Sequence, residues 1–150
     1  MKNKRYSIIP ASFLVLIKNN KVLLQRRYRT GYHDGLYGLC AGHVEEKETF
    51  TETIIREAKE EIGVDLKAKD LEIVHFMQGY ALPNPRELRG RADVFILAKK
   101  WKGEPKNMEP HKCDDVRWFS LNSLPKNTIP FIKEALKNIK NNKIYSEFGF

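Results

Sequence analysis

Cysteine is scarce in this sequence, and its two copies, Cys40 and Cys113, do not form a CxxC pair. Two such cysteines are too few for a disulfide framework and lack the spacing of a cysteine zinc site. No apolar run approaches the roughly 18 residues that a membrane helix needs, since Pro10 interrupts the longest one, 8–17. The basic first residues are not followed by a sustained apolar stretch and a small-residue cleavage site. We therefore expect no membrane association, no secretion and a reducing, cytoplasmic location.

Internal repeats, low-complexity tracts and linkers are also absent from the sequence. A length of 150 residues suits one core, because domains most often run to roughly 100–150 residues. The hydrophobic set makes up 41% of the residues, and there are eight Phe, six Tyr and two Trp, which excludes a disordered chain. The sequence therefore predicts a single globular domain over residues 1–150.

Acidic residues are missing from the first part of the chain and crowded in its middle. Residues 1–33 carry eight Lys or Arg and no acid, whereas 45–72 hold ten of the nineteen acids, and the net charge is +8. Residues 126–143 are again basic, with five Lys against one Glu. An acidic cluster within a basic chain can hold a metal ion beside bound phosphate, although both regions could also be ordinary solvated faces.

The pattern of β-branched and aromatic residues predicts several strands joined by polar loops. The clearest hairpin joins strands at 6–17 and 21–27 through a turn at Asn19 and Asn20. The other expected strands are 39–44, 71–82, 91–101 and 115–119. The expected loops are 30–38, 83–90 and 103–110.

Two helices are expected between these strands. In the first, 49–62, Thr49 and Glu52 fit a capping box and Gly63 fits a C-terminal cap. The second begins at Thr128, with Pro130 in its first turn. The aromatic tail 145–150 is expected to pack back on the domain. The order of strands and helices favours an α/β (α+β) fold with a mixed sheet.

The first helix carries a convergent acidic face. Glu57, Glu60 and Glu61 lie three and four residues apart, so their carboxylates fall within about 100° of the helix surface. Like charges at this spacing repel one another, and a helix C-terminus disfavours anions, so a cation would relieve the cost. Hard oxygen ligands suit Mg²⁺, with Mn²⁺ as an alternative. The plainer interpretation is a solvated face that pairs with Arg56 and Lys59.

The surrounding residues decide between these interpretations. Seven glycine and charged residues recur around the acidic face at a fixed spacing, namely Gly42, Glu48, Arg56, Glu57, Glu60, Glu61 and Gly63. This spacing matches the loop–helix–loop signature of the Nudix hydrolases, so the chain resembles that family. A soft departure is Ala58, where a larger aliphatic residue is usual and where we expect an effect on packing alone.

The resemblance implies a Nudix-type α/β/α sandwich with a mixed sheet, and an enzyme that hydrolyses phosphorus-containing acid anhydrides with Mg²⁺. It implies that Glu60 and Glu61 are the main metal ligands and that the carbonyl of Ala41 is a further one. Glu57 is implied to be a ligand or the base that prepares the attacking water.

The same resemblance implies supporting roles around these ligands. Arg56 would orient Glu57, and Glu48 would pair with Arg56 to fix the loop. Gly42 and Gly63 would serve tight backbone geometry.

A second stretch, 104–118, is similar to MutT-like nucleoside triphosphate diphosphatases, as is the loop 31–35, so the resemblance covers roughly residues 8–140. It implies a nucleotide substrate, cleaved to a nucleoside monophosphate and pyrophosphate. It places Arg27 near the phosphates, where a plain surface arginine is the alternative. Leu39 and Phe131 would line the nucleoside pocket, although Phe131 could be an ordinary core residue.

Several alternatives stay open at this point. Glu109 is either a further acid of the metal site or an ordinary loop residue. Tyr80 lies where dinucleoside polyphosphate hydrolases of the family often carry a tyrosine. No extended motif of the coenzyme A or NADH subfamilies is present. Trp118 is expected in the core, and the histidines show no metal-ligand spacing.

The net charge of +8 also admits an RNA 5′-end pyrophosphohydrolase or a basic RNA-binding protein. No RNA-binding motif is visible, so we expect no stable nucleic-acid complex. A homodimer is compatible with the sequence.

Overall fold

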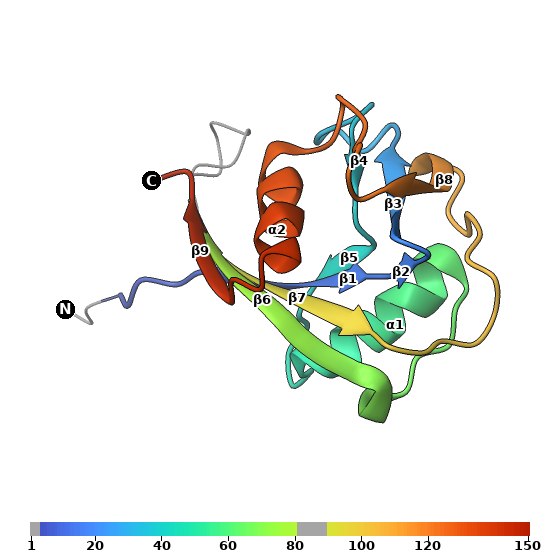
Figure 1. Cartoon of the computed structure of the whole chain (residues 1–150). Helices are drawn as coiled ribbons and strands as arrows, with labels where there is room; N and C mark the ends of the chain where they lie inside the picture. Colours follow the sequence, from blue (N-terminus) through green and yellow to red (C-terminus); the bar gives the residue numbers. More distant parts are fainter. Residues whose placement is uncertain (1–3, 81–89) are drawn as a thin grey trace.

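The computed structural model describes residues 4–80 and 90–150, which form a mixed five-stranded sheet, a smaller sheet and two helices (Figure 1). The larger sheet has the order β5-β1-β7-β6-β9. The β1–β7 and β6–β9 pairs are parallel, whereas β1–β5 and β6–β7 are antiparallel, which confirms the predicted mixed sheet. Its strands are β1 (Ile9–Val15), β5 (Ala41–His43), β6 (Leu71–Gly79), β7 (Arg91–Ala98) and β9 (Tyr145–Phe148).

The smaller sheet is built around β3, which pairs with the other three strands of that sheet. The predicted 21–27 strand has the bounds expected, and Asn19 and Asn20 form the turn before it with φ of 53° and 59°. Asparagine tolerates this left-handed region better than most residues, which explains its use at a tight turn. The strands are β2 (Ile17–Lys18), β3 (Lys21–Arg27), β4 (Tyr37–Gly38) and β8 (Cys113–Ser120).

The alternation of side chains along β1 divides the interior into two cores. Phe13 and Val15 belong to the core under α2 (Pro130–Lys140), and Leu14 and Leu16 to the core under α1 (Phe50–Ile62). Because successive strand side chains point to opposite faces, the two helices cover opposite faces of the larger sheet. The predicted α/β/α sandwich is therefore confirmed.

The ends of α1 follow the predicted capping chemistry. The Thr49 side chain accepts from the backbone N–H of Glu52, and the Glu52 side chain accepts from the backbone N–H of Thr49. Gly63 ends the helix in the left-handed region with φ of 71°. Ala58 is fully buried beside Ile54, which agrees with its expected packing role.

Some predicted boundaries were wrong. The expected strand 6–17 divides at Leu16 into β1 and β2, because β1 pairs in the larger sheet and β2 pairs with β3 in the smaller one. The expected loop 30–38 contains β4, since Tyr37 and Gly38 pair with β3. The expected strand 39–44 contracts to β5. A short 3₁₀ helix, η1 (Ala68–Asp70), was not foreseen.

The remaining elements agree more closely. β6 and β7 end before the predicted 82 and 101, β8 is longer than 115–119, and α2 begins two residues after Thr128. Most of the predicted loop 83–90 lies outside the described residues. The tail packs back as predicted, because β9 adds to the sheet beside β6. Within 4–80 and 90–150, no helix has the length and apolar character needed to cross a membrane.

Candidate active site

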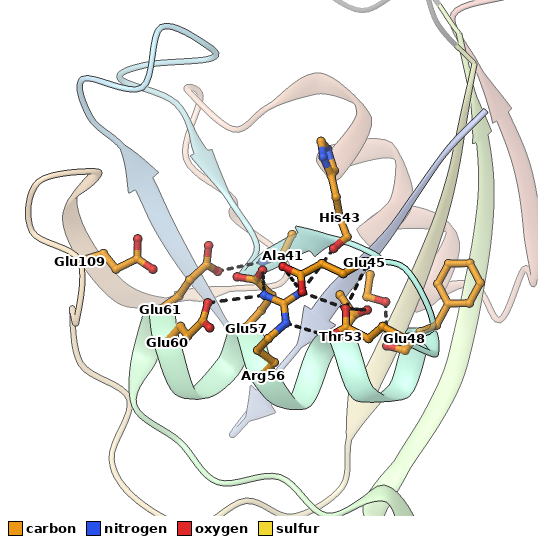
Figure 2. Close-up of polar contacts among 12 residues, drawn as sticks. Ala41, His43, Glu45, Glu48, Thr53, Arg56, Glu57, Glu60, Glu61 and Glu109 are labelled. Carbon is orange, nitrogen blue, oxygen red and sulfur yellow. Dashed lines mark hydrogen bonds and ion pairs between the residues drawn. The ribbon is translucent and has the colours of Figure 1, made fainter. Parts of the chain in front are cut away.

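The acidic face of α1 is turned toward the end of β5. Figure 2 shows Glu57, Glu60 and Glu61 rising from successive turns of the helix toward Ala41. The backbone N–H of Ala41 donates to a carboxylate oxygen of Glu61 over 3.0 Å. The predicted convergence of the three carboxylates is therefore seen, and β5 is the strand that they face. The role of the Ala41 carbonyl as a metal ligand stays a prediction.

Arg56 lies at the centre of the polar contacts beside these glutamates (Figure 2). Its Nε and Nη2 donate to the two oxygens of Glu48 over 2.8 and 2.9 Å, and its Nη1 donates to Glu57 over 2.6 Å. Thr53 donates a further bond to Glu48, and together these bonds lower the pKa of Glu48 to about 2. The geometry matches the predicted pairing, since one planar guanidinium holds two carboxylates in fixed orientations.

Glu61 is the recessed member of the acidic face. Burial raises its pKa to about 7, hydrogen bonds from Cys40 and Ala41 oppose this shift, and the negative charge of Glu57 reinforces it. The side-chain amide of Gln25 also lies 3.3 Å from the carboxylate. The ionised form of Glu61 is therefore costly in the protein alone and would be favoured by a cation.

Glu57 packs directly against the backbone of β5. A Cβ atom at Gly42 would lie 2.1 Å from Glu57 Oε1, so any side chain at position 42 would displace the carboxylate. Burial also raises the pKa of Glu57, against the opposing effect of Arg56. The signature glycine is thus explained by close approach, whereas Gly63 is explained by its left-handed backbone.

A further acid reaches the same place from a distant part of the chain. Glu109 lies in the loop before β8 and faces the α1 glutamates (Figure 2), and its charge helps to raise the pKa of Glu61. Its carboxylate is 3.6 Å from Lys112. These acids border a hollow of about 390 Å³ that we call the acidic hollow. Its lining includes Gln25, Arg26, Arg27, Thr30, Glu45, Arg56, Glu57, Glu60, Glu61, Glu109, Lys112 and Cys113.

The donor set of the acidic hollow fits a hard divalent cation. Its acidic oxygens come from glutamates, and like-charge repulsion among Glu57, Glu61 and Glu109 contributes to the raised pKa values. Among residues 4–80 and 90–150, however, no three acidic, His or Cys side chains are already gathered tightly enough to form a metal site. The carboxylates of the hollow would therefore have to move closer together to surround an ion.

A second cavity of about 390 Å³ lies on the α2 side of the larger sheet, and we call it the aromatic pocket. Leu39 and Phe131, both predicted to line a nucleoside pocket, are among its walls. The Phe131 ring meets Phe13 edge to face, with centroids 5.7 Å apart. Its lining residues include Ile9, Ala11, Phe13, Gln25, Arg27, Thr30, Gly31, Tyr32, Leu39, Ala41, His43, Arg91, Ile129, Phe131 and Ile132.

The acidic hollow and the aromatic pocket share part of their walls. Gln25, Arg27 and Thr30 line both cavities. The guanidinium of Arg27 is held at this junction, because its Nε donates to the carbonyl of Tyr32 over 2.6 Å. The predicted phosphate-side residue thus lies where a bound molecule would pass from one cavity to the other.

Two buried residues at the aromatic pocket were not predicted as site residues. Arg91 and Asp93 were assigned to an expected strand, and both side chains lie on the face of β7 that looks toward α2. Their spacing of two residues in an otherwise apolar strand places both charges on one face, and this was the signal that could have indicated a site. Tyr32 lies in the loop 31–35, and the sequence predicted no role for this residue.

The other residues considered from sequence lie elsewhere. Trp118 stacks against Trp101 in the core under α1, as expected. Tyr80 stacks on Phe150 and is not among the described residues that line either cavity. His75 is fully buried against β9, bonded to Lys143 and Ser146.

Comparison with known sequences finds NAD-capped RNA hydrolases among the similar proteins. The chain is 31% identical over 122 residues to the NAD-capped RNA hydrolase NudC of Pseudomonas aeruginosa, which covers 81% of this chain and 40% of that protein. It is 28% identical over 123 residues to the NudC of Stutzerimonas stutzeri, with the same coverage of 81% and 40%. The chain thus spans about 40% of the length of these relatives.

Solved structures share the fold. A MutT NUDIX hydrolase from Burkholderia pseudomallei matches with a TM-score of 0.77 and 23% identity, over 87% of this chain and 97% of that one. The E. coli ORF135 protein matches with a TM-score of 0.66 and 22% identity, over 90% and 92%. The model of the NUDIX domain matches residues 9–139. With its signature glutamates gathered on α1 against β5, the chain belongs to the Nudix family.

Proposed function

We propose that the protein is a divalent-metal-dependent hydrolase that cleaves a nucleoside triphosphate to a nucleoside monophosphate and pyrophosphate. The observation that carries this proposal is the shared wall between the acidic hollow and the aromatic pocket. A pocket of about 390 Å³ with aromatic walls suits a nucleoside, and an adjacent set of carboxylates suits metal-bound phosphates. The relative placement of the two cavities would present one phosphorus atom to the acids.

The side chains divide the work of this reaction. Arg27, at the junction, would bind the phosphates next to the nucleoside. Glu57 would accept the proton of the attacking water, because burial gives its carboxylate a raised pKa and therefore a greater affinity for a proton. Arg56 would hold Glu57 in place from the side that faces Glu48.

Glu57, Glu60 and Glu61 would hold the cation, with Glu109 approaching from the opposite wall of the hollow. A bound Mg²⁺ or Mn²⁺ supplies charge neutralisation of the phosphates and a more acidic water. Gln25 and Ala41 would keep the Glu61 carboxylate directed into the hollow.

A panel of nucleoside triphosphates, assayed with Mg²⁺ and with Mn²⁺, would test the proposal. We expect pyrophosphate and a monophosphate as products, and no activity in chelator. Reaction in ¹⁸O-labelled water would show which phosphorus is attacked. Release of inorganic phosphate and a nucleoside diphosphate would contradict the proposal, as would full activity without a divalent cation.

A second candidate is hydrolysis at the 5′ end of RNA. It is favoured by the relatives, which are named NAD-capped RNA hydrolases, and by the net charge of +8. Competing NAD-capped RNA against free triphosphates in one assay would separate the two candidates. A steep loss of RNA affinity with rising salt would indicate several phosphate contacts and favour RNA.

A further inference from the structure

A buried ion pair forms part of the aromatic pocket. Arg91 is 8% exposed and Asp93 2% exposed, and the Nε of Arg91 donates to Asp93 over 3.1 Å. Arg91 lines the pocket, whereas Asp93 is not among the described lining residues. The guanidinium is therefore presented to the cavity with a carboxylate anchoring one of its edges.

Aromatic rings hold the guanidinium on its other sides. Its central carbon lies 5.8 Å from the Phe13 ring centroid and 5.3 Å from that of Phe131, which also line the pocket. Its Nη1 is 3.4 Å from the hydroxyl of Tyr32. Phe13, Phe131 and Tyr32 thus meet at one cationic group. Its five N–H donors exceed the two bonds that it forms with Asp93 and Tyr32 within residues 4–80 and 90–150.

Packing alone does not account for this pair. Removing two charges from water costs several kcal/mol per ion, and apolar residues of similar volume often serve stability as well or better. Burial raises the pKa of Asp93 to about 6 despite the adjacent guanidinium, which reflects that cost. A buried ion pair that borders a ligand pocket is better explained by the ligand that it would meet.

We propose that Arg91, fixed by Asp93, selects bases whose ring edge carries a carbonyl oxygen over bases that carry an amino group there. This inference rests on the proposed function, since it names the class of nucleotide that enters the aromatic pocket. A fixed guanidinium offers only donors, so it pairs with the acceptor of a 6-oxopurine or a 4-oxopyrimidine. An amino group at the same place would set donor against donor and leave the N–H groups of the guanidinium that face the base without an acceptor.

The first test uses the unaltered protein and substrates that differ at this edge. Inosine triphosphate and adenosine triphosphate differ in carrying an oxo or an amino group at position 6, and uridine and cytidine triphosphates form the matching pyrimidine pair. We expect kcat/KM to favour the oxo member by at least about tenfold in each pair. Equal rates, or a preference for the amino members, would overturn the proposal.

The second test assigns the preference to Arg91. In Arg91→Gln, whose amide both donates and accepts, the oxo-to-amino ratio should fall to within about threefold. Arg91→Lys keeps the buried charge but loses the planar fork, and should also reduce the ratio. If a folded variant keeps the full oxo-to-amino ratio of kcat/KM, Arg91 does not determine the choice of base. The matched control is Arg117→Gln, which breaks an exposed i, i+2 Arg–Asp pair on β8 and should leave the ratio unchanged.

A binding measurement separates this inference from the proposed function. Titration with inosine and adenosine monophosphates reports the pocket without any hydrolysis, and we expect tighter binding of inosine monophosphate by the unaltered protein. If no triphosphate is cleaved while this difference is seen, the proposed reaction fails and the selectivity of Arg91 stands. If triphosphates are cleaved and the two monophosphates bind equally, the reaction stands and the inference fails.

Discussion

At the scale of single residues, we expect Glu61 to link proton binding to metal binding. Because its pKa is about 7, protons would compete with a bound cation for the carboxylate near neutral pH. We expect the affinity for Mn²⁺ to weaken by about tenfold from pH 8 to pH 6, because about nine in ten Glu61 side chains are protonated one unit below the pKa. Titration of Mn²⁺ by electron paramagnetic resonance at both pH values would measure this. Equal affinities would show that Glu61 is not a ligand.

The same residue affects stability in the metal-free protein. Its pKa is raised above the ordinary 4.5, so protonation favours the folded state, and this stabilisation is lost as the pH rises from about 4.5 to about 7. Glu61→Gln should therefore exceed the unaltered protein in free energy of unfolding at pH 8, by about 1–3 kcal/mol, and match it near pH 4.5. Urea unfolding in chelator would check this. Glu60→Gln is the matched control, because Glu60 is 53% exposed and should change stability little.

Arg56 and Lys59 are both basic residues of α1, but their contacts predict different effects on activity. Arg56 joins Glu48 to Glu57, whereas Lys59 pairs only with the exposed Asp65 over 3.0 Å in the described structure. We expect Arg56→Ala to lower kcat about 10- to 100-fold and Lys59→Ala to leave it nearly unchanged. Steady-state kinetics at saturating Mg²⁺ would compare them. Small and equal effects would mean that Arg56 does not position Glu57.

At the scale of elements, the contact between β5 and α1 sets the position of Glu57. In Gly42→Ala the new methyl group would lie 2.1 Å from Glu57 Oε1, well inside van der Waals contact, so the carboxylate must move. We expect kcat to fall by at least about tenfold, because a 1 Å misplacement of a catalytic group can cost a hundredfold. Gly63→Ala is the comparison, since its cost is strain at φ of 71° and should appear mainly as lost stability of about 1 kcal/mol. Steady-state kinetics and thermal unfolding would measure both effects. A loss of kcat in Gly63→Ala and a loss of stability alone in Gly42→Ala would contradict these expectations.

Elements with local causes were predictable, and contacts between distant segments were not. The caps of α1 and the grouping of Glu57, Glu60 and Glu61 follow from spacing along one helix. The break between β1 and β2 and the short β4 depend on pairing with β3, which the periodicity of the sequence cannot reveal. Arg91 meets Phe13 and Phe131 because of the parallel register of β1 with β7 and the packing of α2, and no local pattern encodes either.

At the scale of the whole molecule, a buried histidine of β6 adds side-chain hydrogen bonds to the pairing of β6 with β9. The two ring nitrogens of His75 contact the carbonyl of Lys143 and the hydroxyl of Ser146 over 2.6 and 2.7 Å. Ser146→Ala would leave one buried nitrogen without this partner, so we expect a loss of about 1–3 kcal/mol in the free energy of unfolding. Because neither residue lines the acidic hollow or the aromatic pocket, kcat/KM of the folded variant should be unchanged. Unchanged stability in urea unfolding would show that this bond does not hold β9.

The alternation of side chains along β1 has a consequence for how such a protein can diversify. The acids lie on a helix that packs on one face of the sheet, and most walls of the aromatic pocket rise from the other face. Substitutions at Arg91, Phe131 and Ile132 can therefore reshape the pocket without disturbing the packing beneath the glutamates. We expect laboratory evolution toward a new nucleobase to accumulate changes at these positions and to leave the glutamates of α1 intact, so that the choice of base would change while the acidic hollow stays the same.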